Sequence, residues 1–231
     1  MNVAIIPARG GSKRIPRKNL REFHGRPMIE WPIEAAKISG CFDDIVVTTD
    51  DDEIAAIAER AGARAPFRRP ADLSDDRTPT LPVIAHALRW LGEHGVVAKR
   101  ACCIYPTAPF LDAGDLKRGF ELLDKHSSNY VFSATTFPFP VQRALKLDAA
   151  GNAVPAFPES IASRSQDLPE LFHDAGQFYW GTAQAFLEQR PIFGPGSVPL
   201  MLPRIRVQDI DTAEDWRTAE LLFRLYKETS R

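Results

Sequence analysis

The densest group of residues suited to chemistry is a basic, glycine-containing segment at residues 8–20, with the sequence ARGGSKRIPRKNL. Glycines let backbone amides approach a ligand closely, and lysine and arginine supply the positive charge that a polyphosphate requires. The glycine spacing matches neither the P-loop nor the dinucleotide-binding fingerprint. The segment therefore predicts a polyphosphate site of another type, and the alternative is a solvent-exposed basic loop.

A second candidate site is the pair of carboxylates Asp209 and Asp211, which stand two residues apart. On a strand, side chains at this spacing project from the same face, which suits joint coordination of a hard cation. The alternative is that Asp211 or Thr212 caps the helix that follows, because Thr212 and Asp215 have the spacing of a capping box. The two roles are compatible with each other.

Other polar groups favour structural roles. Asp50, Asp51 and Asp52 follow a predicted strand and are typical of a helix cap and a first helical turn. Charged residues at positions 68–69 and 75–76 flank a proline-containing turn, which indicates a solvated loop. The five histidines are scattered without metal-ligand spacing. None of these groups predicts a catalytic centre by itself.

The elements that must position these residues alternate between strand and helix. Strands are predicted at residues 3–6, 44–49 and 101–105, and helices from Pro27 to residue 38 and at 51–61, 79–93 and 112–125. This alternation predicts a mostly parallel sheet with helices on both faces. Ligands of such sheets bind beyond the carboxyl ends of the strands, where residues 8–20 and 106–109 follow predicted strands.

The pattern changes from about residue 137 to 169, where five prolines interrupt weakly alternating segments. Such a segment fits a hairpin or an extended arm better than a core helix. The strand and helix pattern then resumes, with strands predicted at 177–180 and near 205–210 and a helix from 212 to about 227.

Composition limits the classes of function. The 231 residues are 44% hydrophobic and 26% charged, which is sufficient for a full globular core. The formal charge of −1 excludes a general nucleic-acid or membrane-surface binder, which carries a basic excess. It is the sum of +6 in residues 1–26 and −7 in the remainder, so the basic segment favours an anion site over a targeting peptide.

The cysteines and the apolar segments indicate the compartment. Cys102 and Cys103 are adjacent within an apolar run, and with Cys41 they make an odd number, which is typical of reduced thiols. No apolar stretch is long enough to span a bilayer. A cytoplasmic protein is therefore expected.

Residues 5–19 resemble the signature of the nonulosonic acid cytidylyltransferases, the family that includes CMP-N-acetylneuraminate synthetase. The resemblance covers essentially the whole chain and continues through residues 45–50, 69–73, 106–109 and 209–212. It implies a Rossmann-like α/β fold of the nucleotide-diphospho-sugar transferase type, formed as a single domain over residues 1–231. It also implies an inserted dimerisation arm at about 137–169 and a homodimer.

The same resemblance implies transfer of CMP from CTP to the anomeric hydroxyl of a nonulosonic acid, with Mg²⁺ as cofactor and pyrophosphate as the second product. Segments at 23–29, 65–70, 73–76 and 175–180 favour pseudaminic acid as the substrate. Tyr105 stands where sialate synthetases have glutamine. The alternatives are sialic or legionaminic acid, another sugar nucleotidyltransferase, and a nucleotide-binding module without turnover.

Residue roles follow from the resemblance at the matching positions. The catalytic residues are expected to be Arg9, Lys13, Lys18 and Asp211. CTP is expected to contact Gly10, Gly11, Ser12, Arg14, Asn19, Arg69, Thr80 and Thr107. The sugar acid is expected to contact Tyr105, Arg164, Gln166, Phe178 and Tyr179, and Mg²⁺ to bind Asp209 and Asp211. The general base stays open between Asp211 and metal-bound hydroxide.

Overall fold

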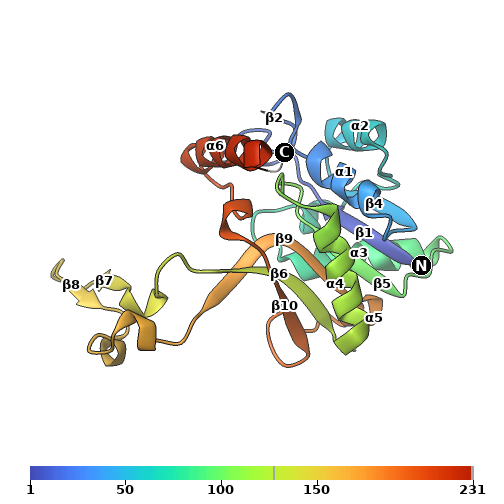
Figure 1. The fold of residues 1–231 in the computed structure, drawn as a ribbon. Coiled ribbons are helices and arrows are strands. Elements are labelled where there is room, and N and C mark those ends of the chain that lie inside the picture. Colours follow the sequence, from blue (N-terminus) through green and yellow to red (C-terminus); the bar gives the residue numbers. More distant parts are fainter. Residues whose placement is uncertain (127, 230–231) are drawn as a thin grey trace.

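The computed structural model describes residues 1–126 and 128–229. Within these residues, six strands form a central sheet in the order β10-β6-β9-β5-β1-β4 (Figure 1). The strands are β1 (Asn2–Pro7), β4 (Asp44–Thr48), β5 (Arg100–Ile104), β6 (Tyr130–Thr136), β9 (Phe172–Thr182) and β10 (Ser197–Met201). All pair in parallel except β9, which runs antiparallel between β5 and β6. The predicted mostly parallel sheet is confirmed, although β6 and β10 were not among the predicted strands.

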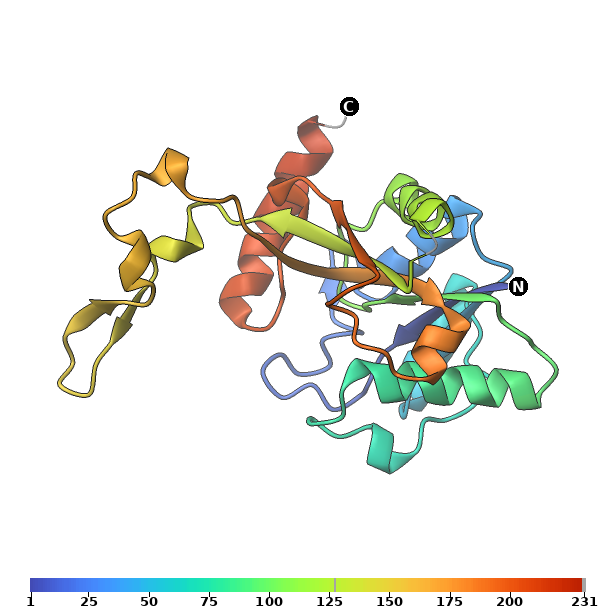
Figure 2. The ribbon, with the colours of Figure 1, turned by 90° about the horizontal axis from the view of Figure 1, so that it is seen from below.

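Helices cover both faces of the sheet (Figure 2). Strand β1 shows why, because Ala4 and Ile6 pack into one buried cluster while Val3 and Ile5 pack into the other. The first cluster includes residues of α1 (Glu30–Ser39), α2 (Asp52–Ala61) and α4 (Ala113–His126). The second includes residues of α3 (Thr80–Glu93) and α5 (Ala183–Leu187). A strand buried on both faces reads as a continuous apolar run, as the sequence of β1 does.

A third apolar cluster lies beneath α6 (Ala213–Thr229). It joins the two candidate sites, because Ile15 belongs to the basic segment and Ile210 lies between the two aspartates. Both side chains are about 1% exposed. The buried members are Ile15, Phe23, Met28, Phe110, Ile210, Trp216, Ala219 and Phe223. Burial of these two isoleucines thus brings segments from opposite ends of the sequence together.

The predicted start of the first helix at Pro27 is wrong. Strands β2 (Glu22–Phe23) and β3 (Arg26–Pro27) form a short antiparallel hairpin, and α1 begins at Glu30. The turn residues His24 and Gly25 have positive φ values of 48° and 87°, as a two-residue hairpin requires. The helices predicted at 51–61, 79–93 and 112–125 are confirmed as α2, α3 and α4.

The predicted strand near residues 205–210 is also wrong. Residues Arg204–Arg206 form a short 3₁₀ helix, η5, and residues 207–211 have no strand pairing. Strand β10 already occupies the sheet edge beside β6, so the chain that leaves β10 passes on toward α6 (Figure 1). The argument that a strand places Asp209 and Asp211 on one face therefore fails.

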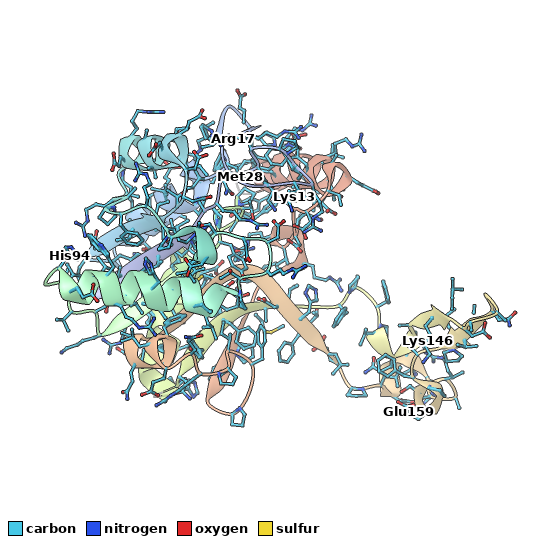
Figure 3. All side chains as sticks on the ribbon, turned by 180° about the vertical axis from the view of Figure 1, so that it is seen from behind. Lys13, Arg17, Met28, His94, Lys146 and Glu159 are labelled. Carbon is cyan, nitrogen blue, oxygen red and sulfur yellow. The ribbon has the colours of Figure 1, made fainter. Side chains whose placement is uncertain are left out.

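Residues 137–171 leave the sheet after β6 and return at β9. They project from the body as an arm, on which Lys146 and Glu159 stand well away from Lys13 (Figure 3). The regular elements of the arm are η2 (Val141–Arg143), β7 (Leu145–Leu147), β8 (Ala153–Pro155), η3 (Pro158–Ser160) and η4 (Ser165–Asp167). Several apolar side chains on the arm are exposed, among them Phe139 at 62% and Leu147 at 73%.

Glycine at position 119 in α4 is required by core packing. A Cβ there would lie 2.9 Å from the rings of both Phe178 and Trp180. Glycine to alanine in a helix ordinarily stabilises by about 0.5–1 kcal/mol, but overpacking costs about 1–3 kcal/mol. Gly119→Ala should therefore lower the free energy of unfolding in urea.

The matched control is Gly92→Ala in α3, where a Cβ meets nothing within 4 Å. This substitution should raise the free energy of unfolding by about 0.5 kcal/mol. Equal stabilisation by the two substitutions would contradict the packing argument.

Candidate active site

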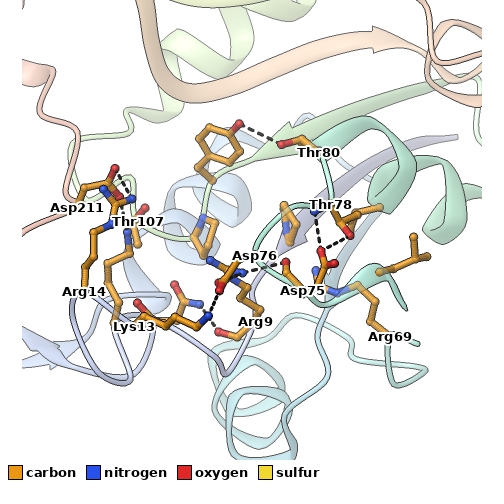
Figure 4. Close-up of a pocket in the computed structure, with 18 residues that line it drawn as sticks. Arg9, Lys13, Arg14, Arg69, Asp75, Asp76, Thr78, Thr80, Thr107 and Asp211 are labelled. Carbon is orange, nitrogen blue, oxygen red and sulfur yellow. Dashed lines mark hydrogen bonds and ion pairs between the residues drawn. The ribbon is translucent and has the colours of Figure 1, made fainter. Parts of the chain in front are cut away.

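A cavity of about 510 Å³ lies at the carboxyl ends of β1 and β5 (Figure 4). From β1 the chain continues to β4 on one side and later returns to β5 on the other, so the cavity lies at a change of direction in the strand order. Ten of the twelve predicted catalytic and CTP-binding residues line it, together with Tyr105. These ten are Arg9, Ser12, Lys13, Arg14, Lys18, Asn19, Arg69, Thr80, Thr107 and Asp211.

Two carboxylates form ion pairs with four of the cations in this cavity. Asp211 pairs with Arg14 at 2.8 Å and with Lys18 at 3.3 Å. Asp76 pairs with Arg9 at 2.6 Å and also with Lys13. Lys18 is further held by the carbonyl oxygen of Ile210, which accepts from its ammonium at 2.6 Å. The positive charge of residues 8–20 is thus partly offset by carboxylates on loops that are distant in sequence.

Arg69 is a buried cation at the cavity wall, with 6% of the residue exposed. Burial lowers its pKa, the Asp50 carboxylate at 3.9 Å acts in the opposite direction, and Arg9 lowers the pKa further. Its guanidinium donates to the hydroxyl of Ser74 at 3.1 Å. An arginine side chain can only donate, so this position suits a neutral acceptor such as a base carbonyl or ring nitrogen.

Gly10 and Gly11 do not line the cavity. The Gly10 amide donates to the Asp50 carboxylate at 3.0 Å, and a Cβ at Gly10 would lie 2.6 Å from the Asp51 carboxylate. Gly10 is therefore needed for close packing against the start of α2, where Asp51 caps the helix as predicted. A Cβ at Gly11 would meet nothing within 4 Å. Phosphate would have to replace Asp50 as the acceptor of the Gly10 amide, so the contact of Gly10 with CTP stays a prediction.

A second cavity of about 510 Å³ adjoins the first and shares Tyr105 with it. Its other lining residues are His173, Asp174, Ala175, Gly176, Val207, Gln208 and Asp209. The Tyr105 hydroxyl lies 3.2 Å from the hydroxyl of Thr80, which lines the first cavity. Burial raises the pKa of Tyr105, so its hydroxyl stays protonated at neutral pH. Tyr105 thus stands between the two cavities with a polar group available to either.

Two of the predicted sugar-binding residues lie on opposite faces of β9. Tyr179 faces toward Tyr105, at 5.5 Å between ring centroids, and donates to the Asp174 carboxylate. Phe178 is fully buried in the core on the α4 side, close to Gly119. The prediction that Phe178 contacts the sugar is wrong, because adjacent residues in a strand project to opposite faces.

The two predicted sugar-binding residues of the arm lie outside both cavities. Arg164 and Gln166 are exposed, and Arg164 pairs with Asp167 of the arm at 2.8 Å. Within one chain, the described structure brings neither residue to Tyr105 or Asp209. These two residues can therefore reach a sugar site only in another copy of the chain, or in their own chain after a movement of the arm.

Asp209 and Asp211 line adjacent cavities, Asp209 the second and Asp211 the first. Burial and the nearby Asp211 carboxylate raise the pKa of Asp209, while Lys18 opposes the shift. In the described residues no group of three or more histidine, cysteine, aspartate or glutamate side chains could hold a metal ion. The pair is nevertheless a suitable donor set for a hard cation, which would relieve their repulsion and take its remaining ligands from phosphate or water.

A buried ion pair anchors the segment that carries these aspartates. Arg206 of η5 pairs with Asp115 of α4, which is 2% exposed. The Arg206 carbonyl accepts from the side-chain amide of Gln177 in β9 at 2.5 Å. Burial lowers the pKa of Arg206, but the Asp115 carboxylate more than offsets it, so the net shift is upward. The side chain of Arg206 is therefore held by α4 and its backbone by β9, three residues before Asp209.

Sequence reasoning missed three carboxylates that matter to the site. Asp76 was assigned to a solvated turn, and Asp115 and Asp174 were not singled out. Asp115 stands in a helix and Asp174 in a strand, where each resembles any other polar residue of the element. The adjacent Asp75 does have the expected turn role, because it accepts from the Thr78 amide and hydroxyl. Only the cations that fold near Asp76 distinguish it from Asp75.

The capping prediction at the last helix is confirmed. The Thr212 hydroxyl accepts from the Asp215 amide at 3.2 Å, and the Asp215 carboxylate accepts from the Thr212 amide at 2.7 Å. Because Thr212 and Asp215 form the box, Asp211 is left to face the cavity. Cys102 and Cys103 are buried free thiols whose pKa values are raised by burial, as expected for core residues.

Two solved structures have a similar fold over nearly the whole chain. CMP:2-keto-3-deoxy-manno-octonic acid synthetase complexed with CTP matches with a TM-score of 0.70 and 17% identity, over 97% of this chain and 99% of that one. The 4-diphosphocytidyl-2C-methyl-D-erythritol synthase of Anaerococcus prevotii matches with a TM-score of 0.66 and 14% identity, over 96% and 98%. These likenesses show the fold, which is the Rossmann-like α/β type predicted from the sequence.

Sequence comparison gives the family. The family model described as cytidylyltransferase matches residues 3–195, and the chain belongs to this family. The pseudaminic acid cytidylyltransferase of Campylobacter jejuni is 45% identical over 99% of both chains. The CMP-N,N'-diacetyllegionaminic acid synthase of Legionella pneumophila is 31% identical over 98% of this chain and 97% of its own.

Among the helices of the described residues, none has the length and apolar character to cross a bilayer.

The Arg206 anchor can be tested by two substitutions around one carboxylate. Asp115→Asn leaves the buried Arg206 charge without its counter-ion, and breaking such a pair costs about 3–5 kcal/mol. Urea unfolding should therefore show a loss of about 3 kcal/mol in the free energy of unfolding.

The matched control is Arg118→Gln, which removes the other partner of Asp115. The Arg118 side chain is 54% exposed, so its loss should cost less than about 1 kcal/mol. Similar losses for Asp115→Asn and Arg118→Gln would contradict the anchoring role of the Arg206 pair.

Proposed function

We propose that this chain transfers CMP from CTP to the anomeric hydroxyl of a nonulosonic acid, namely pseudaminic acid, and releases pyrophosphate. The observation that carries the proposal is the convergence of Arg9, Lys13, Arg14 and Lys18 on one cavity at the end of β1. The relatives support the choice of acid, because a pseudaminic acid cytidylyltransferase is 45% identical over nearly the full length.

The nucleotide occupies the first cavity in this proposal. Its triphosphate lies along the wall formed by the four cations, and its base lies near Arg69. The sugar hydroxyl attacks the α-phosphorus in line and gives up its proton to a base, for which Asp211 is the candidate that lines the cavity. The bond from the α-phosphorus to the bridging oxygen breaks, and the electron pair leaves with pyrophosphate. Charge develops on the phosphate oxygens during this step, so fixed cations provide most of the stabilisation. The Ile210 carbonyl holds Lys18 in place for that role.

The sugar acid occupies the second cavity, beside Tyr105 and Asp174. This arrangement places the acid next to the α-phosphate end of the nucleotide, because the two cavities meet at Tyr105. Tyr105 donates or accepts a hydrogen bond at the sugar, and its contact with Thr80 holds the ring at the junction.

Mg²⁺ is the proposed cofactor, held by Asp209 and Asp211. When bound, it would offset negative charge on the phosphates and lower the pKa of the attacking hydroxyl. Arg14 and Lys18 orient Asp211 through their ion pairs, while burial and the Asp211 carboxylate raise the pKa of Asp209.

A homodimer completes the proposed site. The arm exposes apolar side chains, which is typical of a surface that a partner covers. An apolar cavity of about 430 Å³ near the base of the arm, lined by Phe132, Phe172 and Phe193, is a further surface of this kind. In a dimer the exposed guanidinium of Arg164 would reach the second cavity of the partner and pair with the sugar carboxylate.

A pyrophosphate-release assay tests the proposed reaction directly. With CTP and Mg²⁺, pseudaminic acid should be turned over faster than legionaminic, sialic or 3-deoxy-octulosonic acid, and chelation of the metal should abolish turnover. Faster turnover of another acid would revise the substrate. CTP binding without turnover of any acid would contradict the proposed reaction and support a nucleotide-binding module without turnover.

Two lysine variants serve as controls in that assay. Lys13→Met should lower kcat/KM for CTP about 100-fold, because a cation that stabilises the developing charge is lost. Lys99→Met removes an exposed lysine just before β5, at the opposite end of the strand from the cavity. It should leave kcat/KM for CTP unchanged within about two-fold, as expected of a surface charge screened by salt.

Subunit mixing tests the dimer. Arg164→Ala and Lys13→Ala should each be inactive alone, yet their co-expression should recover about a quarter of wild-type activity, because half of random dimers are mixed and each has one intact site. Light scattering should give the mass of a dimer. A monomer mass, or no recovery on co-expression, would contradict the shared site.

A further inference from the structure

We propose that Asp76 is an internal competitor for the phosphate groups of the nucleotide at Arg9 and Lys13, and that it promotes the release of pyrophosphate. This inference rests on the proposed function, because it assigns a further residue to the same reaction. Asp76 lies in the loop between the 3₁₀ helix η1 (Ala71–Leu73) and α3, and it lines the first cavity.

The contacts of Asp76 place an anion where the proposal places phosphate. One of its carboxylate oxygens lies 2.6 Å from Arg9, and the other pairs with Lys13, as Figure 4 shows. The hydrogen bond from Lys13 lowers the pKa of Asp76, the small cost of burial opposes this, and Arg9 lowers the pKa further. The carboxylate is therefore ionised at neutral pH, and it competes with phosphate for both cations.

The loop does not depend on these ion pairs for its shape. Asp75 fixes the turn, because its carboxylate accepts from the amides of Arg77 and Thr78 and from the Thr78 hydroxyl. The Asp75 carbonyl also accepts from Arg9 at 2.9 Å. The Asp76 side chain is 37% exposed and can rotate into solvent without opening that turn. Displacement by phosphate therefore breaks two partly exposed ion pairs and little else.

The two acidic partners in the cavity have different consequences for the reaction. Asp211 pairs with Arg14 and Lys18 and belongs to the proposed metal site, so it remains in place when CTP binds. Asp76 has no such second role in the cavity. When the bond to the α-phosphorus breaks, the product pyrophosphate carries its charge away from CMP, and Asp76 can return to Arg9 and Lys13. Its return competes with pyrophosphate and favours product release.

Asp76→Asn removes the competing charge, so it should tighten the binding of inorganic pyrophosphate and of CTP. Calorimetric titration in EDTA should give dissociation constants about two- to ten-fold lower than for wild type, as expected for the loss of two partly exposed ion pairs. In the turnover assay, pyrophosphate should inhibit the Asp76→Asn enzyme at concentrations lower by a similar factor.

Asp72→Asn is the matched control. Asp72 is exposed, lies four residues before Asp76 in the same loop region and lies outside the cavity lining. The substitution changes the net charge equally but removes no partner of Arg9 or Lys13, so both dissociation constants should stay within about two-fold of wild type.

The outcomes separate this inference from the proposed function. Binding of both ligands by wild type, with equal or weaker binding by Asp76→Asn, would overturn the competitor role alone and make Asp76 a support for the two cations. Equal tightening by Asp72→Asn would overturn it as well, because long-range charge would then explain the effect. Wild-type protein that binds neither ligand, in EDTA or with Mg²⁺ present, would overturn the proposed function and this inference with it.

Discussion

Repulsion among five cationic side chains in one cavity is the constraint on which the rest of the structure depends. Arg9, Lys13, Arg14, Lys18 and Arg69 line the same space. Unpaired, these charges would oppose folding, and the cost would be greatest for Arg69, which is buried. The fold meets the constraint with Asp50, Asp76 and Asp211, which come from three separate loops. Of these, Asp50 follows β4, which pairs in parallel with β1, so its loop begins at the same edge of the sheet as the basic segment.

Apolar packing and a buried ion pair hold the segment with Asp209 and Asp211 beside the basic segment at residues 8–20. Ile15 and Ile210 are buried in the cluster beneath α6, and Arg206 is tied to Asp115 and Gln177. Between these anchors the backbone is irregular, which allows Asp209 and Asp211 to line different cavities. A strand would have paired the segment with the sheet and presented both carboxylates to one side. The irregular conformation is therefore part of how the site is built.

Strand β9 connects the site to the arm. As the antiparallel member of the sheet, it places Phe178 in the core on one face and Tyr179 beside Tyr105 on the other. Its first residues carry Asp174 at the second cavity, and the chain before it forms the arm.

The sequence by itself determined the parts of this protein whose chemistry is contiguous. The basic segment at residues 8–20, the strands β1, β4 and β5 and the helices α2, α3 and α4 were predictable, because composition and periodicity are local properties. The tertiary structure alone decided the rest. Asp75 and Asp76 are identical in type and adjacent, yet one holds a turn and the other meets two cations. Phe178 and Tyr179 are adjacent, but side chains alternate along β9 and place them on opposite faces of the sheet. The conformation of residues 205–210 depends on side chains that are distant in sequence. Which charges and faces meet is a property of three-dimensional packing, so no local pattern encodes it.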